Sequence, residues 1–290
     1  MAKIMISIKK IFPLFLASLF LFSFQTDQHF SKVLAAFHNG KSDYVMVAAH
    51  RASHKMYVEN SIPAIRHAIE IGVDIIELDV KVTKDSVVVL NHDGKIDRTT
   101  NGTGDPEKYT WAELEQFRLE MPDGTLTNEK LATFEEALLL ANGKALIDID
   151  IKTSNLKPVV DAIKKTGTQN QVFFFDNDYD ALKELLTMLP EAILMPRAYS
   201  YEMADSALRV FAPEVVHIDE SFYTPELTNL LKKKDARIWI NALGKQDELI
   251  RSGKTEEALA NLLRNSANII QTDEPERLIE ILKEKGLRKL

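Results

Sequence analysis

The chain has 290 residues, of which 45% are apolar and 27% charged, with 11 glycines and 10 prolines, a composition typical of a globular protein. It contains no cysteine, which excludes disulfides, thiolate catalysis, cysteine-ligated zinc and iron–sulfur clusters. Its net charge of −7 argues against a nucleic-acid-binding protein, although a few local cations could still hold one phosphate.

The first 25 residues have the features of an export signal. Lys3, Lys9 and Lys10 form a basic start, and residues 11–24 are a 14-residue stretch with 11 apolar side chains. A membrane-spanning helix needs about 20 apolar residues, so this run is short for one. We therefore expect a signal peptide over residues 1–25 and a periplasmic or secreted protein, with an uncleaved N-terminal anchor as the alternative. No later run is long enough to cross a membrane, so we expect no stable span in the mature chain.

From residue 44 onward, short apolar runs alternate with segments of 3.6-residue periodicity, the pattern of parallel strands covered by helices. The expected barrel strands are residues 44–49, 74–80, 145–151, 171–175, 192–195, 215–218, 237–240 and 268–270, and 86–90 is a further extended piece. The intervening helices are expected over residues 61–71, 133–141, 157–165, 180–188, 201–211, 225–234, 247–263 and 274–285. Eight such units in about 250 residues predict an α/β fold, the TIM (β/α)8 barrel. We expect a single domain over residues 26–290, with a small insertion after the second strand region, at about 91–131, that carries one short helix near 111–117.

In this architecture the functional side chains lie at the carboxyl ends of the strands. Ionisable residues cluster at these ends, and two acids of the second strand are two positions apart, so both face the same side. The residues concerned are His50, Arg51, Glu77, Asp79, His92, Asp150 and Lys152.

These residue types indicate metal-assisted chemistry at a phosphate ester. Three carboxylates on neighbouring strands form an oxygen-rich site suited to Ca²⁺ or Mg²⁺. The alternative is that the acids are neutralised by Arg51 and Lys152 without a metal. Two histidines supply an acid and a base, as phosphodiester cleavage requires. The residues alone leave sugar isomerisation and aldol reactions open, because barrels host many functions.

A series of motifs narrows the function further. Residues 49–65 read AHRASHKMYVENSIPAI, and residues 72–104 read GVDIIELDVKVTKDSVVVLNHDGKIDRTTNGTG. Later come IDIK at 149–152, WIN at 239–241 and IIQTDEPERL at 269–278. In this order the motifs resemble those of the glycerophosphodiester phosphodiesterase family, and they span nearly the whole mature chain. The resemblance implies a TIM barrel with a small insertion that hydrolyses glycerophosphodiesters to glycerol 3-phosphate and an alcohol.

The resemblance also implies a role for each matching residue. The general acid and base would be His50 and His92. One divalent cation, Ca²⁺ or Mg²⁺, would be held by Glu77, Asp79 and Asp150. Substrate contacts would come from residues that bind the phosphate or line the glycerol side of the pocket, namely Arg51, Lys152 and Trp239. The supporting residues would be Glu59 and Asn60.

The chain departs from the family pattern at four positions. Ala52 and Ser86 stand where the family usually has glycine, and Val58 stands where it has proline. Asp150 stands where most members carry glutamate. The resulting Asp-x-Lys pair of Asp150 and Lys152 resembles the one in the related sphingomyelinase D-type phospholipases. A phosphodiesterase of that type acting on lysophospholipids is therefore an alternative function, and a catalytically idle barrel that binds a phosphate ligand is another.

Three further residues are expected near the site. The sequence leaves open whether Asp148 or Asp93 joins the metal shell. His217 lies in an apolar strand, so we expect a hydrogen-bonded barrel histidine near the pocket rim. The alcohol of the substrate and the oligomeric state are not determined by the sequence.

Overall fold

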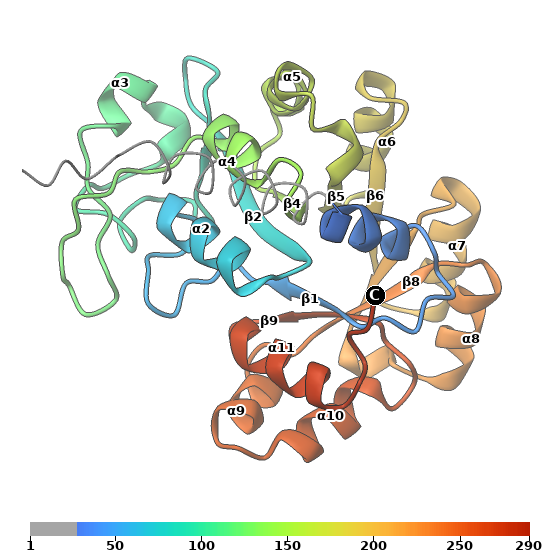
Figure 1. The fold of residues 1–290 in the computed structure, drawn as a ribbon. Helices are drawn as coiled ribbons and strands as arrows, with labels where there is room; N and C mark the ends of the chain where they lie inside the picture. Colours follow the sequence, from blue (N-terminus) through green and yellow to red (C-terminus); the bar gives the residue numbers. More distant parts are fainter. Residues whose placement is uncertain (1–27) are drawn as a thin grey trace, which may run out of the picture.

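The computed structural model describes residues 28–290, which contain a closed barrel of eight parallel strands surrounded by helices (Figure 1). The barrel strands are β1 (Met46–Ala49), β2 (Ile75–Val82), β4 (Leu146–Ile151), β5 (Val172–Asp176), β6 (Ile193–Ala198), β7 (Val215–Ile218), β8 (Arg237–Asn241) and β9 (Ile269–Thr272). The barrel closes because β1 pairs in parallel with both β2 and β9. The predicted TIM barrel is confirmed, and the strand ends differ from the expected ones by at most three residues.

Helices cover the outer surface of the barrel. They are α2 (Ile62–Ile71), α4 (Phe134–Ala141), α5 (Leu156–Thr166), α6 (Tyr179–Met188), α7 (Tyr201–Phe211), α8 (Pro225–Lys233), α9 (Lys245–Arg251), α10 (Thr255–Leu263) and α11 (Pro275–Glu284). The first of them begins where the Ser61 hydroxyl accepts a hydrogen bond from the Ala64 backbone N–H, and it ends at Gly72, whose φ is 78°. The helical region expected over 247–263 is two helices, with Gly253 at a φ of 81° between them.

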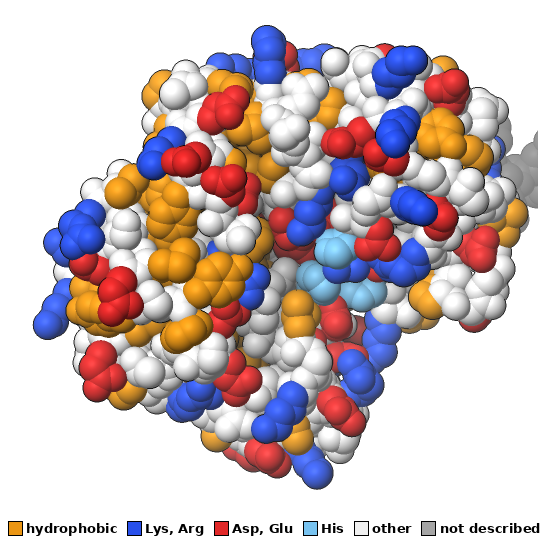
Figure 2. Space-filling view, turned by 180° about the vertical axis from the view of Figure 1, so that it is seen from behind, with side chains coloured by type: hydrophobic (Ala, Val, Ile, Leu, Met, Phe, Trp, Pro, Cys, Tyr) orange, Lys and Arg blue, Asp and Glu red, His pale blue; other side chains and the backbone are white. Residues whose placement is uncertain are grey.

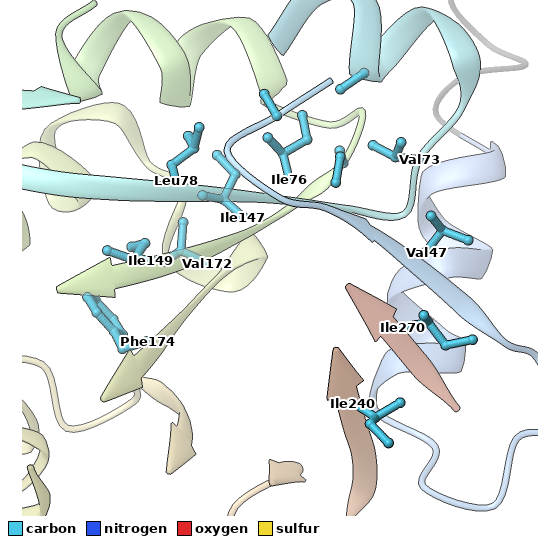
Figure 3. Close-up of a cluster of buried hydrophobic side chains, with 14 of the residues drawn as sticks. Val47, Val73, Ile76, Leu78, Ile147, Ile149, Val172, Phe174, Ile240 and Ile270 are labelled. Carbon is cyan, nitrogen blue, oxygen red and sulfur yellow. The ribbon is translucent and has the colours of Figure 1, made fainter. Parts of the chain in front are cut away.

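The strands direct alternate side chains to the two faces of the barrel wall, and this alternation places the polar residues inside. Ile76 and Leu78 of β2 pack outward against the helices, as do Ile147 and Ile149 of β4 (Figure 3). The residues between them, such as Glu77, therefore point into the barrel. The apolar outer layer stabilises the fold while leaving the inner layer free for chemistry.

The amino-terminal end of the barrel is covered by a helix over residues 28–37, drawn in blue in Figure 1. Val33 and Phe37 of this helix are buried against a cluster of inward-facing side chains that includes Met46, Phe173 and Trp239. We did not predict this helix from the sequence, although its apolar residues have helical spacing. The cluster fills the interior of the barrel at this amino-terminal end. A site can therefore form only at the carboxyl end of the strands.

The insertion leaves the barrel after a hairpin. Strand β3 (Val88–Leu90) pairs antiparallel with β2, and the chain then runs through α3 (Trp111–Leu114) before it returns at α4. Ile96, Leu114 and Leu119 form a small apolar cluster with Val58, the residue that replaces the family's proline. The insertion thus has a core of its own that packs on the loop following β1.

No helix within residues 28–290 is long and apolar enough to cross a membrane. The predicted signal peptide over residues 1–25 lies outside the described part of the chain.

Candidate active site

Three carboxylates meet at the carboxyl end of the barrel. The parallel pairing of β2 with β4 sets Glu77 beside Asp148 and Asp79 beside Asp150. One oxygen from each of Glu77, Asp79 and Asp150 lies within 4.8 Å of the other two. These are the three residues predicted as metal ligands, so the structure brings the predicted set together. Asp148 lies two residues earlier on β4, deeper in the barrel, and is outside this group.

Neighbouring groups hold each of the three carboxylates. The Arg51 backbone N–H donates to Glu77 Oε2 at 2.6 Å, Asn60 Nδ2 donates to Asp79 Oδ2 at 2.8 Å, and Lys152 Nζ donates to Asp150 Oδ2 at 2.7 Å. Asn60, predicted as a supporting residue, thus donates a hydrogen bond directly to the cluster.

The loop after β1 requires an unusual backbone to make these contacts. Arg51, Ala52 and Asn60 have φ values of 50°, 64° and 56°, in the left-handed region that favours glycine. The glycine that the family usually carries at the position of Ala52 fits this conformation. The loop therefore adopts the glycine-type geometry here despite the alanine, and it delivers the Arg51 N–H to Glu77.

The electrostatics of the cluster fit a cation. Burial, followed by repulsion from the neighbouring acids, raises the pKa of Glu77 well above its ordinary value. Burial likewise raises the pKa of Asp150 to about 6, even though Lys152 opposes the shift. Asp79 Oδ1 is buried and has no hydrogen-bond partner within residues 28–290. A hard divalent cation would satisfy that oxygen and offset the repulsion, so the donor set suits Mg²⁺ or Ca²⁺.

Each of the two predicted histidines is held by a carboxylate. His50 Nδ1 lies 2.7 Å from Asp273 Oδ1, and His92 Nδ1 lies 2.7 Å from Asp93 Oδ1. This contact selects the tautomer that carries the proton on Nδ1 and leaves Nε2 of each ring for a substrate. Burial alone would raise the pKa of Asp273, but its hydrogen bond to His50 and the positive charges of His50 and nearby residues hold that pKa below the usual value.

Two cationic side chains lie beside the acids. Arg51 Nε is 3.6 Å from Asp79 Oδ2, and its NH1 donates to Glu59 Oε1 at 3.0 Å. Lys152 Nζ lies 3.7 Å from Asp79 Oδ1, in addition to its hydrogen bond with Asp150. Both predicted phosphate-binding residues are therefore next to the cluster, and the predicted supporting residue Glu59 orients one of them.

Arg98, which we did not predict, connects the insertion to the site. Its NH1 and NH2 donate to the two oxygens of Glu59 at 2.8 and 2.6 Å, and its Nε donates to Asp93 Oδ2 at 2.7 Å. That hydrogen bond to Arg98 is the main reason that the pKa of Asp93 lies far below its usual value. Asp93 therefore orients His92 and is itself held by Arg98, rather than standing in the metal group.

Trp239 is not where we expected it. Its side chain is fully buried in the barrel interior, with its ring centroid 6.1 Å from those of Phe173 and His217. Its Nε1 donates to Asn241 Oδ1 at 3.0 Å, and Asn241 instead lines the pocket. Contrary to the prediction, Trp239 supports the pocket wall from below, because it is one layer deeper than the strand end.

Two other residues of the site were not predicted. Asp273 follows β9 directly, so the rule that places chemistry at strand ends could have identified it. Arg197 is the penultimate residue of β6 and lines the pocket, but an arginine within the apolar run ILMPRA belongs to no motif that we used. His217 lines the same pocket, but its buried ring nitrogens make no hydrogen bond within the described chain, so it is not the hydrogen-bonded histidine that we expected. Figure 2 shows the resulting surface, where histidine side chains gather at a hollow with acidic and basic side chains in and around it.

A barrel with an acidic cluster and two carboxylate-bound imidazoles at its carboxyl end belongs to the class of barrel enzymes equipped for phosphate-ester chemistry. The sequence profile described as "Glycerophosphoryl diester phosphodiesterase family" matches residues 50–287. The chain belongs to this family and is thus a phosphoric diester hydrolase by class.

Individual members of the family are similar to this chain over most of their length. The glycerophosphodiester phosphodiesterase of Caldanaerobacter subterraneus subsp. tengcongensis is 26% identical over 251 residues, which cover 83% of this chain and 99% of that protein. The crystal structure of a glycerophosphoryl diester phosphodiesterase from Parabacteroides distasonis has a TM-score of 0.77 at 25% identity, over 88% of this chain and 92% of that one. A phosphodiesterase from Oleispira antarctica, solved with the product sn-glycerol-3-phosphate, has a TM-score of 0.71 at 20% identity and covers 84% of this chain and 99% of that one.

Proposed function

We propose that this protein hydrolyses glycerophosphodiesters to glycerol 3-phosphate and an alcohol with the help of one divalent cation. The observation that carries the proposal is the meeting of three carboxylates, within 4.8 Å of one another, with two carboxylate-bound imidazoles at one end of the barrel. Membership of the glycerophosphoryl diester phosphodiesterase family supports the same substrate class.

The cation would be held by Glu77, Asp79 and Asp150, whose oxygen atoms are the ligands that Ca²⁺ and Mg²⁺ prefer. When bound, it would polarise the phosphoryl oxygens and stabilise the negative charge of the transition state. Asp150 is one methylene shorter than the family's glutamate, and its Oδ2 accepts a hydrogen bond from Lys152 Nζ at 2.7 Å.

The protein's own groups bind the phosphate and move protons. Arg51 and Lys152 stand beside the cluster and donate to the phosphate oxygens. One of His50 and His92 accepts a proton from the attacking water as its oxygen bonds to phosphorus, and the other donates a proton to the alcohol oxygen as its bond to phosphorus breaks. Asp273 and Asp93 keep Nε2 of each ring directed toward these atoms, since both accept from Nδ1.

We further propose that the protein is exported to the periplasm or secreted. The support is the basic start and the apolar stretch at residues 11–24, which a secretory signal peptide requires. Cell fractionation followed by mass spectrometry of the amino terminus would test this. A chain that begins at Met1 in the cytosolic fraction would contradict the proposal.

The test of the activity is release of glycerol 3-phosphate from glycerophosphocholine and from its ethanolamine, inositol and glycerol analogues. We expect release that stops with EDTA and returns with Ca²⁺ or Mg²⁺. His50→Ala should lower kcat by about 10²-fold or more, since general acid–base catalysis contributes about 10²–10⁴-fold. His67→Ala is the matched control, because His67 lies on α2 and packs against Tyr57, with 5.5 Å between the ring centroids.

Two outcomes would contradict the proposal. Cleavage of a lysophospholipid but of no glycerophosphodiester would favour the sphingomyelinase D-like alternative. Binding of glycerophosphodiesters without turnover, with every cation, would favour the idle binding barrel.

A further inference from the structure

One arginine of the insertion contacts two acids that each hold a different group of the active site. Arg98 donates to Asp93 through Nε at 2.7 Å, and to both oxygens of Glu59 through NH1 and NH2 at 2.8 and 2.6 Å. Asp93 in turn holds His92, and Glu59 holds Arg51. A single guanidinium therefore lies between the ring that would transfer a proton and the side chain that would bind the phosphate.

The backbone of Arg98 is fixed by the insertion itself. Arg98 lies in a turn closed by two hydrogen bonds, because the Thr100 N–H and the Thr100 hydroxyl both donate to the Ile96 carbonyl, at 3.1 and 2.8 Å. Ile96 is fully buried in the apolar cluster of the insertion, and Thr100 is buried as well. An anchored turn thus presents the half-exposed Arg98 side chain to the site.

The contact with Asp93 acts on His92. Asp93 Oδ1 accepts from His92 Nδ1, and Arg98 Nε occupies the other oxygen, Asp93 Oδ2. A carboxylate that is bonded at both oxygens cannot rotate without breaking a hydrogen bond. The hydrogen bond from Arg98, more than any other contact, keeps the pKa of Asp93 far below its usual value, so Asp93 is an ionised acceptor at neutral pH. Arg98 therefore fixes the direction in which His92 Nε2 points.

The contact with Glu59 acts on Arg51. Glu59 is mostly buried, and its Oε1 accepts from Arg98 NH2 at 2.6 Å and from Arg51 NH1 at 3.0 Å. Arg51 Nε is buried and makes no hydrogen bond within the described chain, so this donor is left for a ligand. Without Arg98 on both of its oxygens, Glu59 would be free to pair with two donors of Arg51 and would compete with the phosphate for them.

We propose that Arg98 is a positioning residue for both halves of the reaction, and that the insertion serves catalysis by carrying it. Through Asp93 it directs His92 for proton transfer, and through Glu59 it keeps the donors of Arg51 available to the phosphate. The inference rests on the proposed function, which assigns these tasks to His92 and Arg51. The alternative is that Arg98 only fastens the insertion to the loop after β1.

The first test separates kcat from KM in the cation-loaded enzyme, with the glycerophosphodiester that wild type cleaves fastest. Arg98→Met should raise KM and lower kcat by about 10–100-fold, because a displacement of about 1 Å in a reacting group costs up to about 10²-fold. Arg98→Lys keeps the charge but not the fork that reaches two acids, so its kcat should lie between those of wild type and Arg98→Met.

Arg118→Met is the matched control. Arg118 belongs to the same insertion, and its NH1 donates to the backbone carbonyls of Glu115 and Phe117 at 3.1 and 3.2 Å. This variant should retain the kcat and KM of wild type. If Arg98→Met is unfolded by circular dichroism, Arg98→Lys carries the test.

Double variants show whether Arg98 acts through its two acids. In an Asp93→Asn background, Arg98→Met should lower kcat by much less than it does in wild type. In a Glu59→Gln background, it should raise KM by much less. Fold-changes that simply multiply in both backgrounds would overturn the inference.

Two readouts need no turnover. Isothermal titration calorimetry should show that sn-glycerol 3-phosphate binds severalfold more weakly to Arg98→Met than to wild type. The ring signals of His92 in ¹H–¹⁵N NMR spectra, assigned by their absence from His92→Asn, should move in Arg98→Met and stay in place in Arg118→Met.

The inference is overturned if Arg98→Met has the kcat and KM of wild type, even where its Tm is lower, since Arg98 would then only fasten the insertion. Wild-type kcat in Arg98→Lys would also overturn it, because the charge alone would suffice. A wild-type protein that cleaves no diester would reject the proposed function instead. In that case weaker ligand binding and displaced His92 signals in Arg98→Met would still support the positioning role, and unchanged ones would reject it too.

Discussion

Asp247 shows how a single buried carboxylate supports the site from outside it. It is fully buried, accepts from Thr272 Oγ1 at 2.5 Å and accepts from the Asp273 backbone N–H at 2.8 Å. Asp273 in turn holds His50, so Asp247 fixes the backbone of the residue that orients the catalytic ring. Nothing in its sequence context distinguishes it from a solvated acid in the first turn of α9.

Asp247 should also make the stability of the protein depend on pH. Burial, followed by repulsion from Asp273 and Glu274, raises its pKa to about 6, above the value of about 3.9 expected in the unfolded chain. The native state therefore binds the proton more tightly than the unfolded state. The stabilisation is fully present below about pH 4 and is lost as the pH rises through about 6, an effect of up to about 3 kcal/mol.

Urea unfolding of wild type and Asp247→Asn at several values between about pH 4.5 and about pH 7.5 measures this effect. The free energy of unfolding of wild type should fall relative to that of the variant as the pH rises. Parallel curves for the two proteins across this range would contradict the assignment.

At the scale of elements, the turn between β2 and β3 stores strain that a substitution can release. Ser86 is exposed and has a φ of 68°, a conformation that costs a residue with a Cβ about 1 kcal/mol. The turn is otherwise well bonded, because the Ser86 N–H donates to the Thr83 carbonyl at 3.0 Å and the Thr83 hydroxyl accepts from the Val87 N–H at 2.9 Å. The family's usual glycine at this position therefore has a conformational cause.

Ser86→Gly should raise the free energy of unfolding by up to about 1 kcal/mol, less the entropy that glycine adds to the unfolded chain. The midpoint of urea unfolding measures this gain in stability. Ser86→Ala is the matched control because alanine keeps the Cβ. A gain of the same size in Ser86→Ala would show that the hydroxyl, not the backbone angle, is the cause.

Most elements were predictable because their signals are local. Buried parallel strands have the pattern of short apolar runs, and amphipathic helices have a 3.6-residue period.

The depth of Trp239 in the barrel is a property that no local signal predicts. The alternation along β8 places Arg237, Trp239 and Asn241 on the same inner face, but the depth of each in the barrel depends on the stagger of all the strands. Sequence reasoning therefore identified its face correctly and assigned it to the wrong layer.

At the scale of the whole molecule, the predictability of the site follows the distance along the chain between its parts. The acidic cluster could be predicted because β2 and β4 are neighbours and carry their acids in register. The contact of His50 with Asp273 spans 223 residues and exists only because β9 closes the barrel on β1. The pocket-lining residues Asp148, Arg197 and His217 likewise come from three different strands, β4, β6 and β7. Such contacts between distant residues exist only in the closed barrel, so no single segment of the sequence predicts them.

Closure also means that the cation site exists only in the folded chain, so a cation should stabilise the whole protein. A ligand that binds only the native state at 100 times its dissociation constant adds about 2.7 kcal/mol, which for a protein of this size raises Tm by about 5–10 °C. Thermal unfolding followed by circular dichroism, with EDTA and then with millimolar Mg²⁺ or Ca²⁺, measures the shift.

Asp79→Asn should abolish most of this rise in Tm, because Asp79 supplies a buried oxygen with no partner within residues 28–290. Asp180→Asn, which alters an exposed ion pair with Lys183 on α6, should retain the full shift. An equal shift in wild type and Asp79→Asn would place the cation elsewhere, and no shift in wild type would mean that Arg51 and Lys152 alone neutralise the acids.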